Sequence, residues 1–230
     1  MTLGDSFKRR PVVAVFGPDG SGKSTCIKLL ARYLTTEGYR VRVVWVCSHH
    51  LLMWLAMQIL ARLGHNVVRP FGRRYPHPAY LRSSGGLNNR IWSMLEFLSL
   101  LVVWFLRVRL PQALGYIILV ERYLAASIAD LVYAMGWSIW DSFEVKFLLR
   151  LLARDSLLVF LDASYDTIAR RRGINAEPYD YIKVQKTTYW ALTGSVDFLI
   201  LDTSRIDIWK AYETIKKAAC QRLHLHEIEA

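Results

Sequence analysis

The stretch VVAVFGPDGSGKSTCIKLL, which runs from Val12 to Leu30, constrains the fold more than any other part of the chain. It begins with an apolar, valine-rich run that predicts a buried strand. Glycine, proline, aspartate and serine then give a turn signal, and the remainder has the pattern of a helix. A buried strand joined by a tight turn to a helix is typical of α/β folds with a parallel sheet.

Four more apolar runs repeat this rhythm: VRVVWV, YIILV, SLLVFLD and DFLILD. Each is separated from the next by enough chain for at least one helix, and none alternates strictly, as expected of strands covered on both faces. A chain of 230 residues is too short for two domains of ordinary size. We therefore expect residues 1–230 to form a single domain, a three-layer α/β fold whose five-stranded parallel sheet is flanked by helices.

The charge balance favours an anionic ligand. Lys and Arg number 30 against 19 Asp and Glu, which gives a formal charge of +11, and guanidinium groups pair well with phosphate oxygens. Basic residues that merely keep the protein in solution are the alternative. No nucleic-acid-binding module is recognisable, so no nucleic acid is expected as a partner.

The three cysteines have neither metal-ligand nor disulfide spacing, which favours the reducing environment of the cytoplasm.

Two apolar stretches raise the question of a membrane, Leu51 to Gly64 and Ile91 to Leu110. Both are shorter than the ~20 uninterrupted apolar residues of a span, and the second contains Glu96 and Arg107. We expect buried or oligomer-interface helices, with membrane contact as the less favoured alternative. The N-terminal apolar run is too short for a signal peptide. Residues 51–110 then form an insertion in the domain, and the Pro-, Gly-, Arg- and Tyr-rich interval 64–89 is predicted to be a long functional loop.

The turn itself matches G-x-x-x-x-G-K-[ST], a phosphate-binding loop (P-loop), between a strand and a helix as that motif requires. Its glycines let successive backbone N–H groups point inward at a positive helix end. Lys23 can reach the outer phosphates of a nucleoside triphosphate, and Ser24 can bind Mg²⁺. The predicted cofactors are ATP and Mg²⁺, and the predicted nucleotide contacts are Gly17, Pro18, Asp19, Gly20, Ser21, Gly22, Lys23, Ser24 and Thr25.

The P-loop alone does not select a reaction. The chain lacks the NKxD motif of Ras-like GTPases, and its length leaves no room for the extra domains of a large ATPase. Phosphoryl transfer to a small acceptor is therefore favoured. Glu121 and Arg122 end the third predicted strand, where open α/β sheets bind ligands. The carboxylate can hold a metal ion and the guanidinium a phosphate, although a plain salt-bridging strand end would look the same.

At these residues the chain resembles the thymidylate kinase family. That family has a P-loop of the type Gly-x-Asp-x-x-Gly-Lys-Ser/Thr, matched from Gly17 to Ser24, and an acidic residue, Arg and Tyr after its third strand, matched by Glu121, Arg122 and Tyr123. The segment from Ser156 to Ile182 is similar to its fourth strand, the following helix and the arginine-rich lid. The resemblance extends from Val12 to about Leu223 and implies the fold of a nucleoside monophosphate kinase.

The resemblance implies roles for individual residues. Asp19 would contact the acceptor sugar or the water shell of the metal, Arg122 would hold the acceptor or transferring phosphate, and Glu121 would bind Mg²⁺ through water. A lid of residues 170–182 would close over the transferring phosphate and exclude water. The catalytic residues predicted in this way are Lys23, Arg122, Asp19, Arg170 and Arg172.

The chain departs from the family at the acceptor side. Thymidylate kinases usually carry an arginine after the second strand, whereas this chain continues VWVCSHHLLM. Arg82 and Arg90 are the candidate replacements for acceptor binding, with His49 and His50 as weaker ones.

The favoured hypothesis is an ATP-dependent nucleoside monophosphate kinase acting on dTMP or a related monophosphate, assembled as a homodimer. A P-loop kinase of another small acceptor and a catalytically silent nucleotide-binding module that docks to a partner or membrane remain as alternatives.

Overall fold

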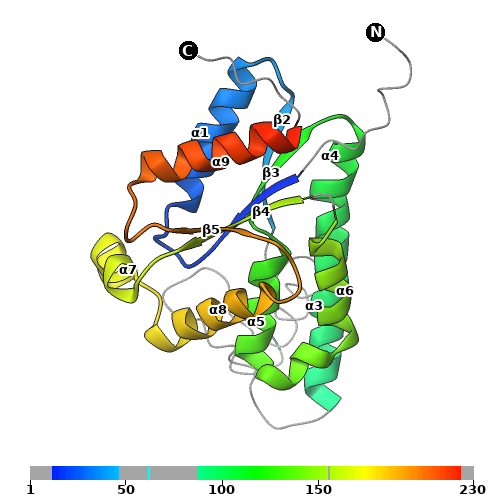
Figure 1. Cartoon of the computed structure of the whole chain (residues 1–230). Coiled ribbons are helices and arrows are strands. Elements are labelled where there is room, and N and C mark those ends of the chain that lie inside the picture. The colour runs from blue at the N-terminus through cyan, green and yellow to red at the C-terminus, as the bar shows by residue number, and fades with distance from the viewer. Residues whose placement is uncertain (1–11, 47–61, 63–86, 155, 224–230) are drawn as a thin grey trace.

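The computed structural model describes residues 12–46, 62, 87–154 and 156–223. These residues build one five-stranded, all-parallel sheet in the order β2-β3-β1-β4-β5, with helices packed on both faces (Figure 1). The predicted three-layer α/β fold is confirmed. All five predicted apolar runs form strands: β1 (Val12–Phe16), β2 (Val41–Val46), β3 (Ile117–Arg122), β4 (Ser156–Asp162) and β5 (Leu199–Asp202).

Strand β1 lies at the centre of the sheet because both of its faces are apolar. Val12 pairs in register with Ile118 of β3 on one side and with Ser156 of β4 on the other. Successive side chains alternate between the two faces, so Val13 and Val15 enter one core cluster while Val12 and its even-numbered neighbours enter the other. Burial on both faces explains why the run has no polar alternation.

Two helical layers cover the sheet. On one face lie α1 (Lys23–Thr36) and α9 (Ile208–Leu223), which pack together (Figure 1). The other face is covered first by α5 (Tyr123–Met135) and α8 (Tyr179–Leu192), which cross in close contact, and further out by α3 (Leu87–Trp104) and α6 (Phe143–Leu152).

The predicted apolar helix of residues 91–110 is present in a modified form. Helix α3 runs into a π-helical turn, η4 (Phe105–Arg109), and then into α4 (Leu110–Ala113). Across the described ranges, no helix combines the length and apolarity needed to cross a membrane. Most of the predicted insertion, residues 51–86 apart from 62, lies outside the described residues, as do His49 and His50.

Short elements complete the second half of the chain. A 3₁₀ turn, η5 (Trp137–Asp141), joins α5 to α6. After β4 the chain forms α7 (Tyr165–Arg172) and a second 3₁₀ turn, η6 (Gly173–Asn175), before α8 begins. The predicted lid, residues 170–182, is therefore the end of α7, the η6 turn and the first turn of α8.

Candidate functional site

The P-loop follows β1 and leads directly into α1, and its backbone depends on glycine. Gly17 has a φ of 144°, and a Cβ atom there would lie 2.1 Å from the carbonyl oxygen of Leu161 on β4. Gly22, which caps the start of α1, has a φ of 96°, a conformation that residues with a Cβ rarely adopt. The local backbone is thus a glycine-dependent turn at the N-terminus of a helix, a geometry that can bind an anion.

Lys23 is the first residue of α1, and its side chain lies under the loop. Only 4% of the residue is exposed, and Nζ donates a hydrogen bond to the carbonyl oxygen of Pro18 at 2.8 Å. Burial lowers the pKa of this lysine; the Asp19 carboxylate opposes that shift, and the positive charge of Arg122 adds to it. An additional anion beside Lys23 would therefore stabilise its charged, protonated form.

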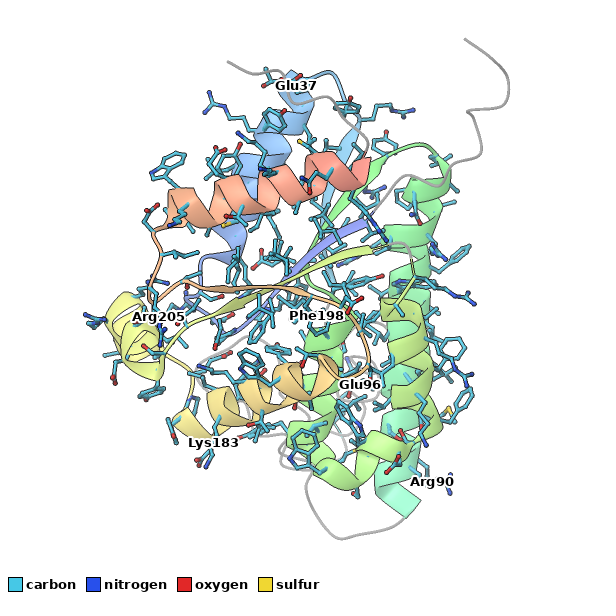
Figure 2. The ribbon with its side chains drawn as sticks, viewed as in Figure 1. Glu37, Arg90, Glu96, Lys183, Phe198 and Arg205 are labelled. Carbon is cyan, nitrogen blue, oxygen red and sulfur yellow. The ribbon has the colours of Figure 1, made fainter. Side chains whose placement is uncertain are left out.

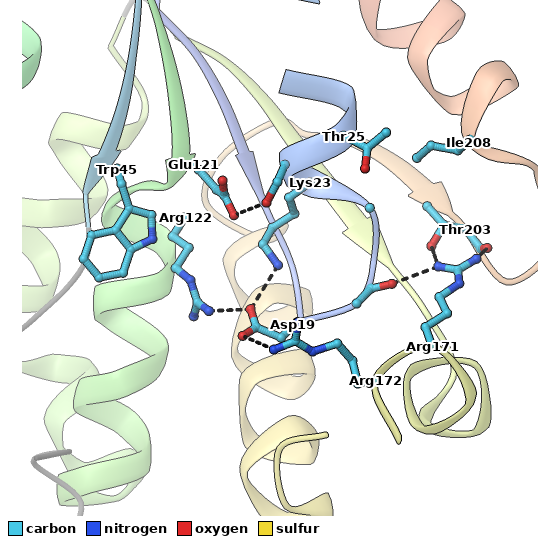
Figure 3. Close-up of a pocket in the computed structure, with 13 residues that line it drawn as sticks. Asp19, Lys23, Thr25, Trp45, Glu121, Arg122, Arg171, Arg172, Thr203 and Ile208 are labelled. Atoms are coloured by element: carbon cyan, nitrogen blue, oxygen red, sulfur yellow. Dashed lines mark hydrogen bonds and ion pairs between the residues drawn. The ribbon is translucent and has the colours of Figure 1, made fainter. Parts of the chain in front are cut away.

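Asp19 is the point where three cationic side chains meet (Figure 3). Its Oδ1 accepts a hydrogen bond from Arg122 and lies 3.4 Å from Nζ of Lys23. Its Oδ2 lies 3.8 Å from a terminal nitrogen of Arg172. One carboxylate cannot neutralise three cations, so the cluster keeps a positive charge that suits a phosphate group.

The backbone at the end of β3 is unusual. Arg122 has a φ of 74° and Tyr123 a φ of 56°, and they are the two non-glycine residues with positive φ in the described chain. Such conformations cost of order 1–3 kcal/mol each and are typical of functional sites. Here the turn directs the Arg122 guanidinium toward Asp19, while the Tyr123 hydroxyl accepts a hydrogen bond from the indole of Trp104 on α3.

Ser24 and Glu121 supply oxygen atoms beside this cluster. The Ser24 hydroxyl donates a hydrogen bond of 2.8 Å to Oε1 of Glu121. A hydroxyl and a carboxylate next to a phosphate-binding loop fit the hard oxygen ligands that Mg²⁺ prefers, with water completing the octahedron. No group of three His, Cys, Asp or Glu side chains suited to a metal occurs within the described ranges. The pair thus fits a metal that is held mainly by phosphate and water.

The arginines at the end of α7 do not act alike. Arg171 donates hydrogen bonds to the backbone oxygens of Gly20 and Thr203 at 3.0 and 2.7 Å, so it links α7 to the P-loop and to the end of β5. The side chain of Arg172 packs closely on the loop at Gly20. A Cβ atom added to Gly20 would lie 3.0 Å from Cγ of Arg172. Arg170 instead donates to the Thr167 hydroxyl on its own helix and does not line the pocket.

These groups line one open cavity of about 670 Å³ at the carboxyl ends of the strands. The structure brings most of the predicted site together there: Asp19, Gly20, Gly22, Lys23, Ser24, Thr25, Glu121, Arg122 and Arg172. The predicted contacts Gly17, Pro18 and Ser21 belong to the same loop but do not line the cavity.

Three lining residues were missed by sequence reasoning, namely Trp45, Thr203 and Ile208, and a fourth, Arg171, lies in the predicted lid but was not among the predicted catalytic residues. Trp45 pairs in register with Glu121 across β2 and β3, and its ring stands beside Glu121 and Arg122 (Figure 3). Its position at a strand end was the available signal. Thr203 and Ile208 line the cavity only because β5 and α9 end and begin next to the P-loop in the folded protein. No local sequence pattern reveals this placement.

The predicted acceptor residues are not joined to this cavity. Arg90 is exposed at the start of α3, well away from the P-loop (Figure 2), and does not line the cavity. Arg82 lies outside the described residues.

No known protein-family model matches this chain, and no curated protein is significantly similar to it in sequence. What the cavity can do chemically is therefore inferred from its own geometry. It can bind a polyanion against three cations, place a metal ion beside Ser24, and present an aromatic ring next to the cationic cluster.

Proposed function

We propose that this protein is an ATP- and Mg²⁺-dependent phosphotransferase, a nucleoside monophosphate kinase of the thymidylate kinase type that phosphorylates dTMP or a related monophosphate. The convergence of Lys23, Arg122 and Arg172 on one point above the P-loop carries this proposal. A site that only binds a triphosphate needs the P-loop and its lysine. Two further arginines from separate elements suit a site that also neutralises a phosphoryl group in transfer.

In this proposal each residue has a defined task. The P-loop amides and Lys23 bind the β- and γ-phosphates, and Ser24 with Glu121 would hold Mg²⁺, which would supply positive charge beside the phosphates. An oxygen of the acceptor phosphate attacks the γ-phosphorus, the bond to the β-phosphate oxygen breaks, and ADP leaves. Arg122 and Arg172 stabilise the charge on the transferring group, and Arg171 holds the end of α7 against the loop.

The acceptor side favours a second candidate, a kinase of the same fold with another small acceptor. Trp45 is the penultimate residue of β2, the strand that an arginine follows in a thymidylate kinase, and it stands in the cavity beside Arg122. An exposed indole offers a flat apolar surface that suits a sugar or base. A homodimer and a cytoplasmic location remain predictions that go with either candidate.

Product formation tests the proposal directly. The purified protein is incubated with ATP, Mg²⁺ and each common ribo- and deoxyribonucleoside monophosphate in turn, and diphosphates are separated by chromatography, with Lys23→Ala as the inactive control. Selective formation of thymidine diphosphate supports the first candidate. ATP binding without any diphosphate product, across all acceptors, would contradict it and favour another acceptor or a silent nucleotide-binding module.

A further inference from the structure

Helix α3 buries apolar and polar side chains together on its inner side, so its central polar residues are not on the exposed side. Ser93, Glu96 and Ser99 are each 1% exposed and face the protein, and Ser93 donates a hydrogen bond to the Glu144 carboxylate on α6 at 3.2 Å. Glu96 points toward the interior of the molecule in Figure 2. A surface helix normally buries its apolar side and exposes its polar side. The outer side of α3 therefore needs a separate explanation.

That outer side is a continuous apolar stripe. Its members recur at intervals of three and four residues, so they share one helix face, and each is between 43% and 54% exposed. We call this set the α3 stripe: Ile91, Met94, Leu98, Val102, Phe105 and Leu106. Exposed apolar surface of this extent is typical of a protein or membrane interaction site.

The stripe continues onto neighbouring elements. Phe143, the first residue of α6, is 63% exposed and its ring lies 6.0 Å from that of Phe97 on α3. Helices α3 and α6 lie side by side along one flank of the molecule, away from the P-loop (Figure 1). A flat partner could thus cover this flank and leave the cavity open to solution.

The charges around the stripe indicate what kind of surface would bind it. Residues 87–113 contain a single carboxylate, Glu96, and it is buried. Arg90 and Arg109 lie on this segment, and Arg150 is exposed on α6. The nearby exposed Asp141 is paired with Lys146 at 3.3 Å. The rim of the stripe is therefore cationic.

A second copy of the chain would fit such a surface poorly. In a two-fold symmetric pair each stripe lies against itself, so the basic rims would face one another with no exposed carboxylate of residues 87–113 between them. Each copy also carries a formal charge of +11. An anionic lipid surface, in contrast, accepts apolar side chains below its headgroups and attracts a basic rim at the same time.

We propose that the α3 stripe binds peripherally to membranes that contain anionic lipids, with α3 lying in the plane of the interface. This helix lies on the bilayer and does not cross it, in keeping with its length and its buried Glu96. The inference concerns a surface remote from the P-loop, so it holds whether or not the protein is a kinase.

Vesicle sedimentation tests the proposal. The full-length protein is mixed with vesicles of phosphatidylcholine alone or of phosphatidylcholine with phosphatidylserine. We expect it to sediment with the anionic vesicles and to be released by salt. Leu98→Glu places a charge in the middle of the stripe and should reduce the bound fraction roughly tenfold. Trp209→Glu, at a more exposed apolar residue on α9 beyond the opposite face of the sheet, should bind as the original protein does.

Three results would overturn the proposal. The first is an original protein that stays in the supernatant with both kinds of vesicle, and the second is a Leu98→Glu variant that sediments as well as the original. The third comes from light scattering: a dimer that Leu98→Glu converts to a monomer would show that a second copy covers the stripe. Circular dichroism of each variant confirms that a loss of binding is not a loss of fold.

Discussion

The hydroxyl of Ser24 lies 2.8 Å from the carboxylate of Glu121, although the two residues are 97 positions apart in the sequence. The P-loop contributes one and the end of β3 the other, and the parallel pairing of β1 with β3 brings them together. Two oxygen atoms that could bind a metal ion are thereby placed side by side next to the P-loop.

Replacing Glu121 by Gln should weaken the use of Mg²⁺. The amide keeps the size of the side chain but removes its charge, so we expect the Mg²⁺ concentration for half-maximal phosphoryl transfer to rise roughly tenfold to hundredfold. Initial rates across a Mg²⁺ series measure this. Glu37→Gln, at the far end of α1 (Figure 2), is the control, and an unchanged Mg²⁺ profile in Glu121→Gln would rule out a metal-binding role.

The three neighbouring arginines of α7 should differ in their effects on catalysis. Arg172 reaches Asp19 and Arg171 the P-loop, whereas Arg170 bonds within its own helix. We expect Arg172→Ala to lower kcat on the order of a hundredfold, Arg171→Ala to have a smaller effect through the position of the lid, and Arg170→Ala to change little. Steady-state kinetics of the three variants decide this. A large loss in Arg170→Ala would instead support the catalytic role that the sequence predicts for it.

Two substitutions of Arg122, which has a positive φ, can distinguish an effect on catalysis from an effect on stability. Glycine adopts a φ of 74° without strain and alanine does not, while both lack the guanidinium. We expect both variants to lose activity, and Arg122→Gly to be more stable than Arg122→Ala by about 1 kcal/mol. Urea unfolding followed by circular dichroism gives the two free energies. Equal stability would show that the turn relaxes when the arginine is removed.

Lys23 should make ATP binding sensitive to pH in the alkaline range. Burial lowers its pKa below the ordinary 10.5, so the ammonium loses its proton, and its attraction for phosphate, before an exposed lysine would. The unfolded chain binds more protons between the two pKa values, so this residue makes stability rise with pH in that window. Lys23→Arg, which keeps its charge to above pH ~12, should retain ATP binding where the original protein loses it. Isothermal titration calorimetry at increasing pH measures ATP binding by the original protein and by Lys23→Arg.

The two described cysteines should be unreactive in the folded protein. Burial raises the pKa of Cys26 to about 11, and Cys220 is likewise buried. In a Cys47→Ser background we expect no thiol to react with Ellman's reagent near pH 8 and two to react after denaturation, because the thiolate is the reactive form. Rapid modification of the folded protein would show that α1 and α9 separate.

The sequence by itself determined the class of fold and the glycine-dependent turn between β1 and α1. Valine-rich runs such as Val12–Phe16 predict buried parallel strands because both faces of such strands are apolar. The P-loop could be recognised because its function depends on local backbone geometry, which glycines at fixed spacing impose. The position of Glu121 and Arg122 at a strand end could be predicted for the same reason: the motif is local.

Only the tertiary structure decided which distant side chains share the cavity. Arg171 rather than Arg170 reaches the P-loop because the orientation of α7 on the sheet sets which helix positions face inward, and three adjacent arginines give no local sign of it. Trp45 enters the cavity through the register of β2 against β3. The exposed apolar side of α3 is equally hidden, since the apolar content of a helix does not show which side the rest of the protein covers.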